Sequence, residues 1–90
     1  MILSFTAQAW ADYQFWAASD PATLRRINDL IRDASRTPFS GIGKPEPLKL
    51  IWKDWWSRRV TVEHRLVYRV MGAGAEQTLV IAACRFHYGA

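Results

Sequence analysis

The chain has 90 residues, enough for one domain with a single core, and we treat residues 1–90 as one domain. Half of the residues are apolar and only 22% are charged, which excludes a disordered chain, and the single cysteine, Cys84, excludes an intrachain disulfide. No apolar run approaches the roughly 20 residues of a membrane-spanning helix, so we expect a cytoplasmic protein without a membrane partner, and the formal charge of +4 favours a polyanionic target.

The opening residues predict a strand and then a helix. Residues 1–5 form a short apolar run, and Thr6 is of a type that commonly caps a helix N-terminus. Alanines and aromatic residues follow at helical spacing over residues 7–18. We interpret the aromatic residues on one side of this helix as a stripe packed on the core, with contact to RNA or a partner as the alternative. They are Trp10, Tyr13 and Trp16.

A second helix is predicted over residues 21–35. Asp20 accepts hydrogen bonds from first-turn amides, and Pro21 suits the first helical position. An apolar face recurs at helical spacing along the helix: Leu24, Ile27, Leu30, Ile31 and Ala34. Basic residues lie off that face, and we interpret them as solvated, with polyanion contact as the alternative. They are Arg25, Arg26, Arg32 and Arg36.

Prolines and glycines punctuate residues 37–47, which predicts a loop of limited flexibility. Prolines on both sides of Glu46 restrict its backbone to extended conformations, at the point where the loop enters the next strand. The pattern Gly41-x-Gly43-Lys44 lacks the remainder of a phosphate-binding P-loop, so we do not predict a nucleotide site there.

From Leu48 onward the pattern becomes strand-like. It predicts a strand over residues 48–53 and three more over 57–62, 66–71 and 79–84. The order of elements predicts an α+β fold, in which two N-terminal helices pack on a mainly antiparallel four- to five-stranded sheet.

Alternation along residues 64–70 predicts which side chains of that strand point outward. The core-facing set is apolar or aromatic: Leu66, Tyr68 and Val70. The other face carries Arg65, Val67 and Arg69, so Arg65 is expected to point outward. His64 then faces inward, and we interpret it as a structural, hydrogen-bonded histidine.

One carboxylate, one imidazole and a cluster of cations form the candidate site. Cleavage of RNA by its own 2′-hydroxyl needs a base, cations that stabilise the phosphate, and an acid for the leaving 5′-oxygen. Glu46 is the expected base and His87 the expected acid, while Arg65 suits a phosphate clamp because guanidinium offers planar bidentate donors. The two histidines and one cysteine lack the spacing of a zinc site, so we predict neither a metal nor another cofactor.

Basic and aromatic residues around this set are expected to bind RNA. Arg58 and Arg59 are adjacent and must diverge, so at most one of them can serve the same pocket directly. Phe86 and Tyr88 are placed to stack on an unpaired base, an interaction worth roughly 1–3 kcal/mol. The expected RNA-binding set is Lys44, Lys49, Arg58, Arg59 and Phe86.

Five blocks of sequence carry a family resemblance. They are Thr37-Pro38-Phe39, Gly43 to Lys49, Trp56 to Arg59, Glu63 to Tyr68 and Ala82 to Tyr88. In residue identity, order and spacing they closely resemble the YoeB/Txe family of bacterial toxins, within the RelE superfamily. The resemblance covers nearly the whole chain. Where that family usually has a polar, glycine-containing link before Trp56, this chain has bulkier and more apolar residues from Leu50 onward.

The resemblance implies a microbial-ribonuclease/RelE-like fold and an endoribonuclease that cuts mRNA in the ribosomal A site, inhibiting translation. It implies that Glu46 is the base, Arg65 the phosphate-stabilising arginine, His87 the acid and Tyr88 the terminal catalytic tyrosine. It also implies a YefM-like antitoxin, the ribosome and mRNA as partners, and it allows a homodimer.

Two alternatives without catalysis compete with this interpretation. One is a ParE-like toxin of the same superfamily, which acts by binding DNA gyrase, and the other is a basic RNA-binding or interaction domain. Glu46, Arg65 and His87 together argue against both, because a pure binding module has no chemical need for that set.

Overall fold

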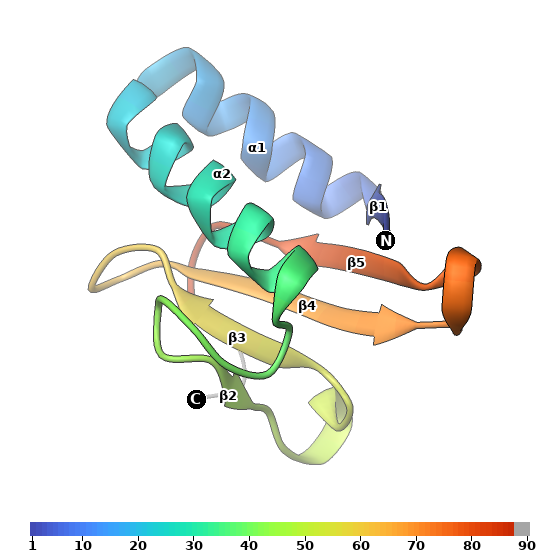
Figure 1. Cartoon of the computed structure of the whole chain (residues 1–90). Coiled ribbons are helices and arrows are strands. Elements are labelled where there is room, and N and C mark those ends of the chain that lie inside the picture. The colour runs from blue at the N-terminus through green and yellow to red at the C-terminus, as the bar shows by residue number, and fades with distance from the viewer. Residues whose placement is uncertain (88–90) are drawn as a thin grey trace.

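Two helices cover one face of a five-stranded sheet in the computed structural model, which describes residues 1–87 (Figure 1). The strand order across the sheet is β1-β5-β4-β3-β2. The strands are β1 (Ile2–Phe5), β2 (Glu46–Pro47), β3 (Trp56–Arg59), β4 (Arg65–Met71) and β5 (Thr78–Ala83). β1 pairs parallel to β5 and every other neighbouring pair is antiparallel. The predicted α+β architecture is confirmed.

Local capping explains where both helices begin. The Thr6 hydroxyl accepts a hydrogen bond from the Ala9 amide at 3.1 Å at the start of α1 (Ala7–Ser19). Asp20 caps α2 (Pro21–Arg36) by accepting from the Thr23 hydroxyl at 2.7 Å and from its amide at 3.2 Å. These two bonds hold the pKa of Asp20 below its ordinary value, and the bond from the Thr23 hydroxyl has the larger effect. Each helix ends one residue later than predicted.

The core lies between the helices and the sheet. The apolar face of α2 packs against the inward side chains of β4 and β5, and full burial of a large apolar side chain contributes about 1.5–3 kcal/mol. The fully buried apolar members include Ile27, Leu30, Leu66, Leu79 and Ile81. Trp16 of the predicted aromatic stripe is also buried, and its indole N–H donates to the Cys84 carbonyl at 2.9 Å. Trp10, in contrast, is 52% exposed and stacks on Tyr13 at the rim.

The predicted strand over residues 48–53 is wrong. Within it, residues Leu50–Trp52 form a 3₁₀ turn, η1, inside a loop that joins β2 to β3 and is closed by a bond from the Leu48 amide to the Trp55 carbonyl at 2.9 Å. Leu50 and Ile51 are 90% and 92% exposed. Alternation indicated a strand here, but no strand within residues 1–87 pairs with this segment, and Leu50 takes a positive φ of 58° that a strand does not allow.

Val67 lies on the face of the sheet that also carries Arg65, as alternation predicted. Val67 is fully buried in the middle of the sheet, where Ser57 of β3 and Ala83 of β5 flank it. Arg69, on the same face, lies with its guanidinium 5.4 Å from the ring centre of Trp55. On the face away from the helices, Val67 is therefore buried, whereas Arg65 and Arg69 on either side of it are partly exposed.

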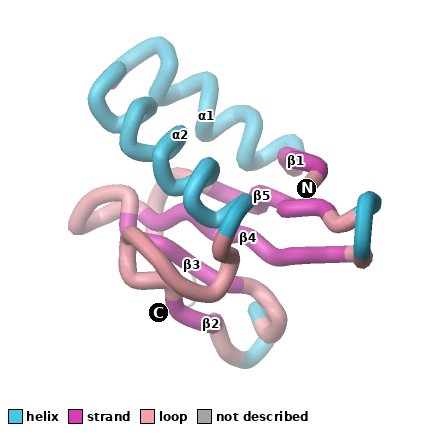
Figure 2. The backbone as a smooth tube through the Cα atoms, viewed as in Figure 1, coloured by secondary structure: helices cyan, strands magenta, loops and turns pink. Residues whose placement is uncertain are grey.

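Loops extend from both ends of β3. Figure 2 shows the β3–β4 turn at the left and the β2–β3 loop at the lower right, and the segment after α2 passes beside β3. The β4–β5 connection contains a second 3₁₀ turn, η2 (Gly74–Glu76), at the far end of the sheet. Within residues 1–87, no helix has the length and apolarity needed to cross a membrane.

Candidate active site

Sheet register brings the predicted base and the predicted phosphate clamp onto one face. Glu46 of β2 lies opposite Ser57 of β3, and Arg59 of β3 lies opposite Arg65 of β4. Opposed residues share a face, and so do residues two apart on one strand. Glu46, Arg59 and Arg65 therefore all project from the sheet face that the helices do not cover.

Glu46 belongs to a strand of two residues at the edge of the sheet. It is exposed, and it lines one end of a pocket of about 530 Å³ whose wall continues through residues 47–52. Lys49 is exposed in the same wall. Within residues 1–87, Glu46 makes no ion pair.

Carbonyl groups of the β3–β4 turn orient Arg65. Its Nη1 donates to the carbonyls of Thr61 at 3.0 Å, Val62 at 3.2 Å and His64 at 3.1 Å. Among the described residues these bonds use Nη1 alone, which leaves the Nε–Nη2 edge for bidentate binding of a phosphate. The predicted outward direction of Arg65 agrees with its partial exposure.

The segment after β5 is tied to β4 by two bonds at Phe86. The Arg65 amide donates to the Phe86 carbonyl at 2.9 Å, and the Phe86 amide donates to Nδ1 of His64 at 2.7 Å. His64 also packs edge-on against Trp16, with ring centres 4.9 Å apart. The structural, hydrogen-bonded role predicted for His64 is confirmed.

Arg85 helps to fix the same segment. Its guanidinium lies 3.5 Å from the ring centre of Phe15 and 4.5 Å from that of Phe86. Phe86 has a φ of 68°, a left-handed conformation that turns the chain sharply before His87. His87 is exposed, and Tyr88 lies outside the described residues.

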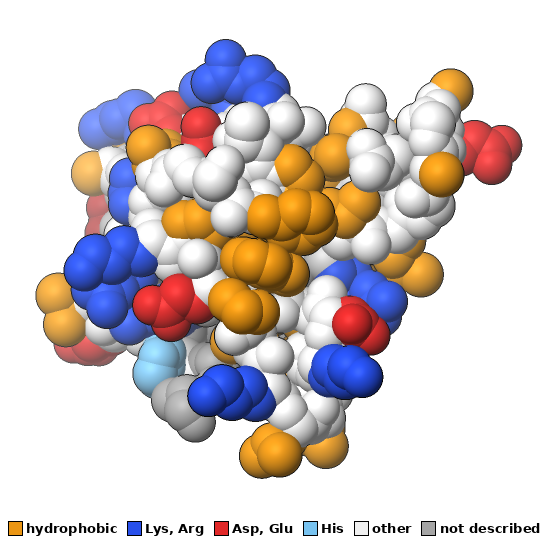
Figure 3. Space-filling view, turned by 60° about the horizontal axis from the view of Figure 1, so that its bottom comes forward, with side chains coloured by type: hydrophobic (Ala, Val, Ile, Leu, Met, Phe, Trp, Pro, Cys, Tyr) orange, Lys and Arg blue, Asp and Glu red, His pale blue; other side chains and the backbone are white. Residues whose placement is uncertain are grey.

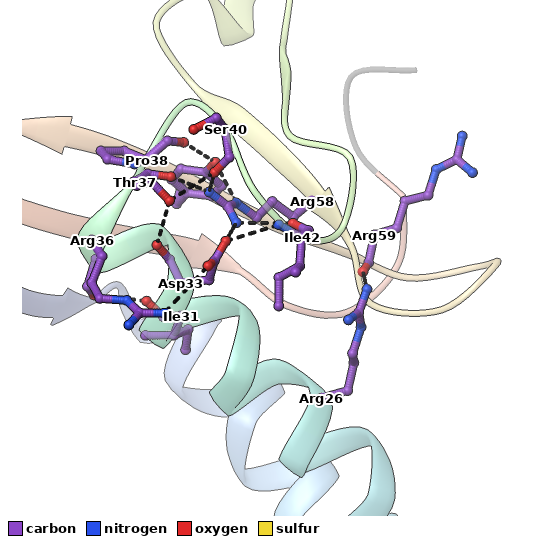
Figure 4. Close-up of polar contacts among 12 residues, drawn as sticks. Arg26, Ile31, Asp33, Arg36, Thr37, Pro38, Ser40, Ile42, Arg58 and Arg59 are labelled. Carbon is purple, nitrogen blue, oxygen red and sulfur yellow. Dashed lines mark hydrogen bonds and ion pairs between the residues drawn. The ribbon is translucent and has the colours of Figure 1, made fainter.

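Arg58 corrects the predicted RNA-binding set. Its side chain is fully buried, and Nη1 donates to Asp33 at 2.6 Å and to the Ile42 carbonyl at 3.0 Å (Figure 4). Nη2 donates to the carbonyls of Thr37 at 2.6 Å and Ser40 at 2.8 Å. The prediction that Arg58 binds RNA is therefore wrong, because its guanidinium holds the loop after α2.

Tyr68 and Asp33 complete this buried network. The Tyr68 hydroxyl accepts from Nε of Arg58 at 3.0 Å and donates to the Pro38 carbonyl at 2.5 Å. Burial raises the pKa of Tyr68, so the phenol stays protonated. The hydrogen bond from Arg58, followed by that from the Ile42 amide, lowers the pKa of Asp33, so the carboxylate stays charged.

The remaining predicted RNA contacts are on the surface. Lys44, Lys49, Arg59 and Phe86 are all exposed. Figure 3 turns the β2 end of the molecule forward and shows cationic side chains around a central apolar band. Cys84, in contrast, is buried, and burial raises the pKa of its thiol to about 12, which rules out a thiolate nucleophile at neutral pH.

A family model for the YoeB-like toxin of bacterial type II toxin-antitoxin systems matches residues 5–88. The chain belongs to the YoeB-like toxin family. It is 50% identical over 88 residues to toxin YoeB of Escherichia coli K12, an alignment that covers 98% of this chain and all of the relative.

Solved structures agree with the YoeB assignment. A YoeB/ParE toxin from Agrobacterium tumefaciens superposes with a TM-score of 0.94 at 56% identity, covering 98% of this chain and 100% of the other. A YoeB dimer from Staphylococcus aureus gives a TM-score of 0.87 at 37% identity, and a heterotetrameric YoeB-YefM complex from that organism gives 0.85 at 37%. Each covers 98% of both chains. The RelE-like fold expected from the sequence is confirmed.

Two features of this YoeB-family structure were missed by the sequence reasoning. Alternation along β3 places Arg58 on the same face as Trp56, which packs on the core, and as the buried Val60, so a signal for its burial was present. Arg26 was interpreted as solvated, but it lines a pocket together with Arg59 and Arg65. No sequence pattern marks this contact, because α2 and the β3–β4 turn are distant in the chain.

Proposed function

We propose that this YoeB-family chain is a ribosome-dependent endoribonuclease that cleaves mRNA in the ribosomal A site and so inhibits translation. The observation that carries the proposal is the register that puts Glu46, Arg59 and Arg65 on one uncovered face of the sheet. A carboxylate on the same face as guanidinium groups that make no ion pair in residues 1–87 is the combination that a phosphodiester transfer needs.

In the proposed reaction, Glu46 takes the proton of the 2′-hydroxyl, whose oxygen then attacks the adjacent phosphorus. The bond from phosphorus to the 5′-oxygen breaks, and His87 donates the proton that the leaving oxygen requires. Arg65 holds the non-bridging oxygens through its free guanidinium edge, where negative charge grows in the transition state. The products are a 2′,3′-cyclic phosphate and a 5′-hydroxyl, and side chains alone supply every step.

The supporting roles follow from exposure and charge. Lys44, Lys49 and Arg59 bind the RNA backbone, and Phe86 stacks on an unpaired base. Tyr88 is assigned to the catalytic set by the family pattern. Because the ribosome holds mRNA in a defined geometry, it supplies much of the orientation that the small, open site lacks. Free RNA is therefore cut poorly.

The partners follow from the relatives. The S. aureus YoeB was solved as a dimer and as a heterotetrameric complex with YefM. By likeness, this chain is neutralised by a YefM-like antitoxin and forms a homodimer. Its site of action is the cytoplasm, where translating ribosomes are found.

A translation extract with a defined mRNA tests the proposal. Wild-type protein should leave 5′-hydroxyl ends at A-site codons, and cleavage should fall roughly 10²- to 10⁴-fold in Glu46→Gln and in His87→Gln, because each removes proton-transfer assistance. Arg65→Ala should abolish cleavage. Arg32→Ala, on the far surface of α2, is the matched control and should cut normally. Intact mRNA with wild-type protein, or full activity in all three site variants, would refute the enzyme.

The ParE-like alternative is tested with the same preparations. A gyrase supercoiling assay should show no inhibition by the wild-type protein. Inhibition of gyrase together with intact mRNA in the extract would replace the nuclease with the non-catalytic function.

A further inference from the structure

We propose a second phosphate site in this protein, formed by Arg26, Arg59 and Arg65. It binds the RNA phosphate that neighbours the cleaved one along the strand. The proposal rests on the nuclease function above and deepens it, because it gives the RNA a path across the molecule. Arg26 is the new element, and it comes from α2 rather than from the sheet.

The site is a pocket of about 480 Å³ at the turn between β3 and β4. Its lining joins one helix to both strands of the hairpin: Arg26, Arg59, Val60, Thr61, Val62 and Arg65. Three of these six residues are arginines, and none is a carboxylate. The pocket therefore shares Arg59 and Arg65 with the candidate active site and extends it toward α2.

Arg26 is held in place by a contact across 33 residues of sequence. Its Nη2 donates to the Arg59 carbonyl at 3.1 Å, as Figure 4 shows, while the Arg59 side chain extends away from Arg26. Within residues 1–87 this is the only hydrogen bond of the Arg26 guanidinium, which has five N–H donors. The remaining donors are free for a ligand.

No carboxylate of residues 1–87 lies in the lining of the pocket. The ion pairs in residues 1–87 involve Arg32, Arg36 and Arg58, so none of the three pocket arginines has a carboxylate partner. Asp20 and Glu63 line an adjoining pocket that shares Thr61 and Val62 with this one. A concavity lined by three arginines and no carboxylate favours an anion.

A phosphate of a single-stranded RNA fits this pocket better than an acidic peptide. Guanidinium groups bind phosphate bidentately, and the apolar part of the lining is limited to two valines, Val60 and Val62. Arg65 belongs to both sites, so a strand with its cleaved phosphate on Arg65 presents a neighbouring phosphate to Arg26. The RNA then runs from Glu46 on β2, across the β3–β4 turn, toward α2.

Equilibrium binding of a non-cleavable RNA tests this path. The probe is a short single-stranded RNA with a 2′-deoxy substitution at the cleavage position, titrated by fluorescence anisotropy over a series of salt concentrations. Each phosphate contact contributes about 0.7 to the slope of log affinity against log salt for single strands. Arg26→Ala should lower the slope by about that amount and weaken binding to all sequences alike.

Arg25→Ala is the matched control, because Arg25 is the neighbouring, exposed cation on the same helix and lines no part of the pocket. It should keep the wild-type slope, and Arg26→Lys should keep most of it. Arg26→Gln repeats the test without the charge if Arg26→Ala unfolds. Equal losses in Arg26→Ala and Arg25→Ala would overturn the site, since the effect would then be net charge alone.

Two further outcomes distinguish an RNA site from a protein-binding site, and the pocket from the nuclease function. An Arg26→Ala variant that binds RNA normally but loses affinity for an acidic peptide would assign the pocket to a protein partner and overturn the proposal. In the second outcome, the salt slope differs between wild type and Arg26→Ala as expected, but the wild-type protein leaves mRNA intact in the extract. That result would support the pocket and refute the nuclease.

Discussion

Arg58 and Arg59 are consecutive residues of β3 with opposite roles. Arg58 faces the helices, is fully buried and makes five side-chain hydrogen bonds. Arg59 faces the uncovered side of the sheet and is exposed, with no ion pair in residues 1–87. Residue type alone therefore does not identify a nucleic-acid contact. What distinguishes Arg58 is that its bonds occupy all three guanidinium nitrogens, so none is left for a ligand.

Replacing each arginine by alanine gives the largest expected contrast. Arg58→Ala should lower the free energy of unfolding by about 3–5 kcal/mol, because it leaves the Asp33 carboxylate and several carbonyls without their donor. Arg59→Ala should change it by no more than about 0.5 kcal/mol, since only its backbone takes part in bonds within residues 1–87. Urea unfolding curves with equal slopes check both values. Similar losses in the two variants would contradict the contrast.

Asp33→Asn tests the buried Arg58 network through the pH dependence of stability. Because the folded-state pKa of Asp33 lies below its unfolded value of about 3.9, its contribution to stability is complete above about pH 5 and is lost as pH falls through the lowered pKa. Stability of the variant should therefore fall less steeply than that of the wild type below pH 5. Its loss at neutral pH should be smaller than that of Arg58→Ala, since one acceptor of five is altered.

Asp29→Asn is the matched control for the ion pair at neutral pH. Asp29 is on the same helix, but its ion pair with Arg32 at 2.9 Å is open to solvent, with side chains 58% and 68% exposed. Because exposed ion pairs contribute little, the free energy of unfolding of this variant at pH 7 should stay close to that of the wild type and above that of Asp33→Asn. Equal losses in the two variants, measured by urea unfolding, would contradict the special role of the pair between Asp33 and Arg58.

Tyr68→Phe is expected to have the smallest effect on this network. It removes one hydroxyl that bridges Arg58 and the Pro38 carbonyl, at a cost of about 1–3 kcal/mol for a buried site. Tyr13→Phe is the control, because its hydroxyl bonds Asn28 at 2.7 Å in a partly exposed position and should cost less. Thermal unfolding of both variants gives the order. An equal or larger shift in Tyr13→Phe would contradict it.

The parts of the fold that depend on local chemistry were predictable. Thr6 and Asp20 begin their helices through bonds to amides three residues away, so the signal and the contact lie in the same stretch of sequence. The inward role of His64 followed from strand alternation. These predictions needed no knowledge of distant neighbours.

The parts of the fold that depend on residues distant in the sequence could not be predicted in this way. The acceptors of Arg58 lie 10 to 25 residues away, and they surround it only once the loop after α2 has folded over β3. Residues 48–53 alternate as in a strand, but within residues 1–87 no strand pairs with them. The sequence named Glu46 and Arg65 as site residues, but the register that places them on one face comes from pairing through β3.

The parallel pairing of β1 with β5 has a consequence for the timing of synthesis. Residues 2–5 pair with residues 78–81, so β1 cannot join the sheet of a growing chain until residues 78–81 have been synthesised. Contacts this distant in sequence also form slowly, because loop closure must precede them. Because β5 lies between β1 and β4, the order in which the ribosome releases these strands makes the closing of this edge a late step of folding.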